Sequence, residues 1–110
     1  MGKYATYRKR GATTGAESTL PVPPPPAMPE PEEDLRVRQF EPDNTGGVYR
    51  LYYSEAGVAP WDHVATVAWA GVQVWGDVDD YDAGSYYSTT VGNGVDFAGE
   101  SDPSNIIVLE

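Results

Sequence analysis

The chain has 110 residues, a length that allows one domain, and it contains no cysteine, so no disulfide can stabilise a small core. Its formal net charge is −10, and residues 51–110 carry ten acidic residues without any lysine or arginine. No stretch of about 18 apolar residues is present, which excludes a membrane-spanning helix, and the basic N-terminus lacks the apolar run of a signal peptide. This charge distribution predicts a basic arm on an acidic body that would repel nucleic acid and anionic membranes.

Residues 1–20 form the expected N-terminal arm. The segment is rich in Gly, Ala, Thr and Ser and lacks helical or strand periodicity, so alone it should be disordered. We interpret it as an anchor that docks on a partner, with a merely solvated tail as the alternative. We also expect Met1 to mark a complete gene product. The candidate partner-binding residues of the arm are aromatic or basic: Tyr4, Tyr7, Arg8, Lys9 and Arg10.

Residues 21–33 are proline-rich and favour polyproline II, an extended helix without internal hydrogen bonds. Because proline removes backbone donors, this segment cannot be an inner strand of a sheet. We expect it to serve either as a semi-rigid spacer or as a strap along a surface. A ligand for a proline-binding domain is an alternative.

Residues 34–110 show the short alternating runs of an antiparallel β-structure. In the first run, Leu35, Val37 and Gln39 share one face. One or two of Trp61, Trp69 and Trp75 should lie in the core, and the remainder at the surface. The predicted strands are residues 34–40, 48–54, 63–70, 72–78, 86–91 and 105–109.

The stretch 81–87 reads as a tight corner that leads into a strand, and Gly84 supplies a position that tolerates positive φ. The spacing Tyr81-x-Ala83-Gly84-x-x-Tyr87 resembles the fibronectin type III pattern Leu-x-Pro-Gly-x-x-Tyr, with Tyr in place of Leu and Ala in place of Pro. Gly99-Glu-Ser-Asp-Pro-Ser104 is similar to that family's turn into its last strand. The resemblance implies an all-β fold, a small antiparallel immunoglobulin-like β-sandwich over residues 34–110. It also implies a tyrosine corner, in which the phenol of Tyr87 bonds to the backbone upstream.

The resemblance has two further implications for the N-terminal half of this body. The family's first strand would precede Asp34, where this chain has prolines, so we expect that strand to be absent or to be replaced by the strap. An edge beside the next strand would then be partly uncovered and open to β-addition by a partner. Phe40 stands where the family often has Trp.

Tyrosines dominate the predicted body. By alternation and by the family's strand order, Tyr49, Tyr53 and Tyr87 should point inward. Tyr52 and Tyr86, with one Trp, should lie on the outer face of adjacent strands. Such a face could bind sugar or protein, or it could be ordinary cross-strand pairing.

Residues with metal or catalytic chemistry are few. Asp77, Asp79, Asp80 and Asp82 could offer oxygens to Ca²⁺, but their spacing is not that of an EF-hand, and we interpret them as a solvated acidic turn. His63 is the single histidine, so a histidine-based metal cluster or a Ser-His-Asp triad is not expected. The sequence therefore predicts no catalytic residue and no cofactor, with Ca²⁺ as the one alternative.

These features together favour a non-enzymatic structural or interaction protein. By analogy of fold, we expect a virion accessory protein, a capsid decoration or minor structural protein assembled in the host cytoplasm. Its arm would bind capsid shell proteins, and the sandwich would project or cover a joint. The alternative is a carbohydrate or cell-surface binding module that uses the Tyr/Trp face for a host-surface glycan. Homo-oligomers stay open, and the four cations of the arm would give nucleic acid only weak, salt-sensitive affinity.

Overall fold

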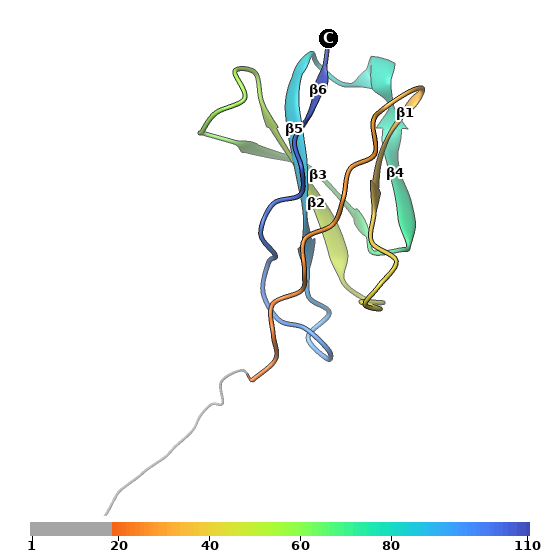
Figure 1. Ribbon diagram of the computed structural model, residues 1–110, viewed down its shortest axis with the longest axis vertical. Coiled ribbons are helices and arrows are strands. Elements are labelled where there is room, and N and C mark those ends of the chain that lie inside the picture. The colour runs from red at the N-terminus through yellow and green to blue at the C-terminus, as the bar shows by residue number, and fades with distance from the viewer. Residues whose placement is uncertain (1–18) are drawn as a thin grey trace, which may run out of the picture.

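The computed structural model describes residues 19–110, and the fold they form is all-β (Figure 1). Each of the six predicted strands is present, with ends that differ by a few residues from those expected. The elements are β1 (Asp34–Arg38), β2 (Val48–Ser54), β3 (Asp62–Ala68), β4 (Val72–Asp77), the 3₁₀ turn η1 (Val78–Asp80), β5 (Gly84–Val91) and β6 (Ile107–Leu109).

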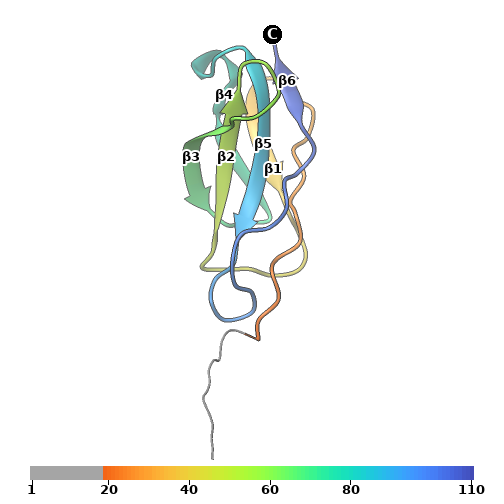
Figure 2. The same cartoon turned by 90° about the vertical axis from the view of Figure 1, so that its left-hand side faces the viewer.

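The strands form two antiparallel sheets that pack face to face as a β-sandwich, as predicted (Figures 1 and 2). One sheet has the order β1-β4 and the other has the order β3-β2-β5-β6. Strand β2 lies inside the larger sheet and pairs with both β3 and β5. The larger sheet therefore has a broad outer face, opposite the core.

The core lies between the sheets and follows the predicted alternation in β1, where Leu35 and Val37 are fully buried. Trp75 is buried and Trp69 packs against the core, whereas Phe40 is 64% exposed and does not fill a core position. Because burial of each such apolar side chain contributes about 1.5–3 kcal/mol, this cluster is the main source of stability. Its members are Met28, Leu35, Val37, Tyr49, Leu51, Trp75, Tyr86 and Ile107.

A buried amide, Gln39, connects the two sheets with the proline-rich segment. Its Oε1 accepts hydrogen bonds from Trp69 Nε1 at 2.9 Å and from Thr90 Oγ1 at 3.1 Å. Its Nε2 donates to the carbonyl of Pro24 at 2.6 Å. The polar side chain is tolerated inside the sandwich because these three bonds satisfy both ends of the amide.

The proline-rich segment is a strap bound along the sandwich. Ala27 and Arg38 exchange two backbone hydrogen bonds of 2.9 Å, and the Asn105 side chain bonds the N–H and C=O of Met28, also at 2.9 Å each. The strap runs along the side between β1 and β6 (Figure 2). The expectation of an uncovered edge beside β1 is therefore wrong at Arg38, where the strap itself supplies the pairing.

The segment between β5 and β6 runs back along β5 instead of forming only a compact turn. The N–H of Ser88 donates to Ser104 Oγ, and the N–H of Thr90 donates to Ser101 Oγ, each at 2.9 Å. In return, the N–H of Ser104 donates to the carbonyl of Ser88 and the N–H of Ser101 donates to the carbonyl of Thr90, each at 2.8 Å. Serine side chains thus replace part of a backbone ladder beside Pro103, which has no N–H.

The tyrosine corner is formed by Tyr86, so the prediction of Tyr87 was wrong by one residue. Tyr86 is 2% exposed, and its hydroxyl donates to the carbonyl of Asp82 at 2.6 Å. Tyr87 lies half-buried on the opposite face of β5. Gly84 has the expected positive φ, +145°, and a Cβ there would lie 2.6 Å from Tyr53 Cε1. That contact leaves room only for glycine.

The remaining predicted corner residue, Tyr81, packs partly buried against the core. Its hydroxyl donates to the carbonyl of Trp75 at 3.0 Å, and its ring meets that of Tyr86 edge-on at 6.0 Å between centroids. Burial raises the pKa of Tyr81, and it raises the pKa of Tyr86 to about 12. Both phenols are therefore held neutral and hydrogen-bonded at the corner.

Candidate functional site

Four rings form a continuous row on the outer face of the larger sheet, which we call the aromatic surface: Trp61, Tyr87, Tyr52 and His63. The centroid distances are 4.7 Å from Trp61 to Tyr87, 5.0 Å from Tyr87 to Tyr52 and 5.5 Å from Tyr52 to His63. His63 is exposed and the other three rings are half-buried. Figure 2 looks onto this face, and the strap runs beside it rather than across it.

Strand register explains why these rings meet. Tyr52 of β2 lies directly opposite Tyr87 of β5, and cross-strand neighbours in this position can stack. On the other side of β2, an irregularity in the pairing with β3 follows Leu51 and places His63 opposite Tyr52. Trp61 immediately precedes β3 and reaches the Tyr87 ring edge-on.

A cluster of polar side chains bonded to the carboxylate of Glu100 adjoins the aromatic surface. Glu100 accepts hydrogen bonds from Thr89 Oγ1 at 2.6 Å and from the hydroxyl of Tyr52, and it pairs with Arg50 at 3.1 Å. Burial raises the pKa of Glu100, but the hydrogen bonds from Thr89 and Tyr52 and the charge of Arg50 outweigh it. The pKa of Glu100 therefore lies below its ordinary value, and the group stays a carboxylate.

The predicted outer tyrosines fall on different sides of the sheet. Tyr52 lies on the outer face, as expected, whereas Tyr86 lies in the core and its place is taken by Tyr87. Tyr49 is in the core and Tyr53 packs against it, as predicted. The prediction assigned Tyr86 and Tyr87 to the wrong faces because the inward positions that follow in β5 are Ser88 and Thr90. Hydrophobicity therefore does not identify the buried side of this strand.

The acidic residues that the sequence offered to Ca²⁺ lie at and beside η1. The carboxylate of Asp77 accepts a hydrogen bond from the N–H of Asp79 at 2.9 Å and so caps this turn. Asp80 and Asp82 are exposed. Within residues 19–110, no group of three or more His, Cys, Asp or Glu side chains is close enough to hold a metal ion. The candidate partner-binding residues of the arm, Tyr4, Tyr7, Arg8, Lys9 and Arg10, lie outside the described residues.

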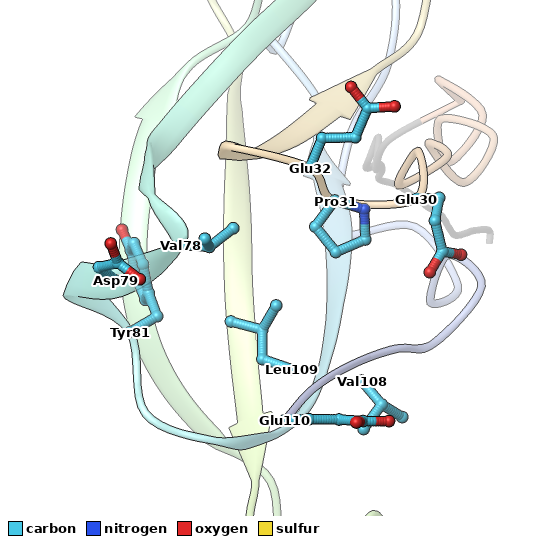
Figure 3. A pocket seen from close by; sticks show the side chains of 9 residues that line it. All are labelled: Glu30, Pro31, Glu32, Val78, Asp79, Tyr81, Val108, Leu109 and Glu110. Atoms are coloured by element: carbon cyan, nitrogen blue, oxygen red, sulfur yellow. The ribbon is translucent and has the colours of Figure 1, made fainter.

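An acidic pocket of about 310 Å³, which no sequence pattern predicted, lies at the end of the sandwich that carries the C-terminus (Figure 3). Apolar side chains and carboxylates from the strap, η1 and β6 line it together. Its charge disfavours an anionic ligand. The lining residues are Glu30, Pro31, Glu32, Val78, Asp79, Tyr81, Val108, Leu109 and Glu110.

Sequence reasoning missed Trp61, Tyr87, Glu100 and Arg50 as members of one surface. The available signal was the pair of Tyr-Tyr dipeptides, since in a sandwich one tyrosine of each pair must face outward. Glu100 reaches these tyrosines because the segment after β5 returns along the sheet. The composition of the loop does not specify that path.

No protein-family model, curated protein or solved structure matches this chain. Among residues 19–110, no helix has the length and apolar character needed to cross a membrane.

Proposed function

We propose that this chain is a non-enzymatic attachment protein, a fibronectin type III-like sandwich that its N-terminal arm anchors to a large protein assembly. The strand order supports the family assignment. If β1 to β6 are the strands B, C, C′, E, F and G, one sheet is B-E and the other is C′-C-F-G, which is the immunoglobulin-like division of strands. The bond from Tyr86 to Asp82, at the entrance to F, agrees with the same assignment.

The observation that carries the attachment proposal is the fixed course of the strap. The bonds from Ala98 N to the Pro21 carbonyl, at 2.9 Å, and from Gln39 to Pro24 hold the start of the strap on the sandwich. Its described start lies at the end opposite the C-terminus (Figure 1). The preceding arm therefore leaves from a defined point, and an arm bound to an assembly would make the sandwich project lengthwise.

The charge of the arm and the analogy with other small sandwiches indicate the kind of assembly. The arm carries Lys3, Arg8, Lys9 and Arg10, whereas the body is strongly acidic. An arm of this kind favours an acidic protein surface. Small sandwiches attached in this way serve as accessory proteins of viral particles, so we propose a capsid shell as the partner and the virion as the location.

Sedimentation of particles from the source tests the proposal. A tagged full-length chain should travel with the particle fraction, and the quadruple variant K3Q/R8Q/K9Q/R10Q should move to the soluble fraction while its circular dichroism stays unchanged. The matched control R36Q/R38Q, which removes cations from the body, should still sediment. If the arm variant sediments as the wild type does, the proposal is wrong.

A further inference from the structure

We propose that the aromatic surface is a binding site for neutral oligosaccharides. This inference goes beyond attachment, because it concerns what the projecting sandwich recognises. The rings of the aromatic surface contribute little to the stability of the fold. The rings of Trp61, Tyr87 and Tyr52 lie outside the core, where cross-strand pairs contribute only about 0.2–1 kcal/mol each to stability. A contiguous aromatic patch on an outer face is typical of an interaction site.

The chemistry of the rings fits a ligand that is apolar on its faces and polar at its edges. The Trp61 indole N–H and the Tyr87 hydroxyl make no hydrogen bond to another residue in the described part of the chain. Both side chains are half-buried, so each exposes part of an apolar ring together with an unbonded polar group. A pyranose ring has the matching pattern, with C–H groups on its face and hydroxyls around its edge.

The adjoining cluster limits the patch and supplies a polar rim. Glu100 is already bonded to Thr89, Tyr52 and Arg50, so it holds the rim in place instead of leaving an unpaired charge. Thr66 of β3 bonds His63 at 2.8 Å on the other side. The rings are thus edged by hydrogen-bonded polar groups, whereas the centre of a stable protein interface is apolar.

Charge selects among saccharides. The chain has a net charge of −10, and Arg50, on the same strand as Tyr52, is paired with Glu100. Sialylated, sulfated and uronic-acid glycans would be repelled, as would nucleic acid and anionic lipid. A neutral oligosaccharide avoids this repulsion.

The test is an NMR titration of the ¹⁵N-labelled full chain with maltohexaose, cellohexaose, chitohexaose and mannohexaose, and with 3′-sialyllactose and a heparin hexasaccharide as anionic comparisons. At least one neutral saccharide should cause saturable shifts around Trp61, Tyr87 and Tyr52 at concentrations up to about 10 mM. The anionic saccharides should bind more weakly or not at all.

Variants locate the site and separate it from the attachment function. Because an aromatic contact is worth about 0.5–1.5 kcal/mol, W61A should weaken binding up to about tenfold. Y87F, which removes only the free hydroxyl, should weaken it by less, and F40A, which removes an exposed ring just beyond the end of β1, should leave it unchanged. The arm variant K3Q/R8Q/K9Q/R10Q should bind saccharide as the wild type does.

Three results would overturn the inference: no saturable shift with any neutral saccharide, a wild-type affinity in both W61A and Y87F, or a preference for the anionic saccharides. Intact ¹⁵N spectra of each variant show that it is folded, so a loss of binding in W61A reports on the site.

Discussion

Adjacent residues of β5 have opposite roles, and the difference lies in their hydroxyl groups as much as in their rings. Tyr86 places its ring in the core and donates to the Asp82 carbonyl, whereas Tyr87 places its ring on the aromatic surface, where its hydroxyl has no partner among residues 19–110. Sequence spacing located the corner but assigned it to the wrong tyrosine, because both residues are compatible with either face. The register with Tyr52 and Tyr53 of β2 decides the matter.

The first prediction compares Y86F with Y87F. Y86F removes a buried hydrogen bond and should lower the free energy of unfolding by about 1 kcal/mol. Y87F should change it by less than about 0.5 kcal/mol, since its hydroxyl has no partner within residues 19–110. Urea unfolding followed by tryptophan fluorescence measures both. Equal effects, or a larger effect of Y87F, would contradict the assigned corner.

The second prediction concerns Glu100 and pH. Its pKa in the folded chain lies below the ordinary value of 4.5, so ionisation of this group favours the folded state. The stabilisation is complete above about pH 4.5 and disappears as the pH falls through the lower pKa of the folded state. E100Q should therefore be less stable than the wild type at pH 7.

The same variant should lose its deficit in acid. Urea midpoints measured from pH 7 to pH 2.5 should converge for E100Q and the wild type. If the difference between the two urea midpoints stays constant across this range, the charge of Glu100 does not contribute to stability, and this account of its pKa is wrong.

The strap is the element whose role sequence reasoning left open. Prolines at 21–31 exclude an inner strand, but they are compatible with a spacer or a strap. The decision depends on side chains far away in sequence: Gln39 bonds Pro24, and Asn105 bonds Met28. Such polar partners do not show in a hydrophobic pattern. Six strands and the core face of β1, by contrast, were predictable because alternation is a local property.

The third prediction tests how the strap and the two sheets depend on Gln39. Q39L keeps the volume of the side chain but leaves the Trp69 N–H and the buried Thr90 hydroxyl without their acceptor. The expected loss in free energy of unfolding is about 2–4 kcal/mol. The matched control is Q73L on β4, where the amide is bonded at the surface and the loss should be below about 1 kcal/mol.

Limited proteolysis of Q39L provides a second measurement of the same effect. Cleavage within residues 21–31 should become faster than in the wild type, because the strap loses its bond to Gln39. If Q39L retains wild-type stability and an equally resistant strap, the amide is not what connects the strap to the sheets.

At the scale of the whole molecule, three regions have distinct chemistry. The basic residues of the arm precede the strap, the aromatic surface covers one face of the sandwich, and the acidic pocket lies at the end with the C-terminus. The charge division was visible in the sequence because it is additive along the chain. The aromatic surface was predicted only in part, through Tyr52 and one Trp, and the pocket was not predicted, since both assemble residues from segments that only the fold brings together.

The attachment of the arm to a larger assembly is the central claim, and the lysines of the chain allow a direct test. Lys3 and Lys9 are the only lysines, so an amine-reactive crosslinker reports on the arm alone. Crosslinking of intact particles that contain the chain, followed by mass spectrometry, should yield peptides that join Lys3 or Lys9 to a shell protein. Crosslinks confined to copies of this chain, or none to any shell protein, would contradict the claim.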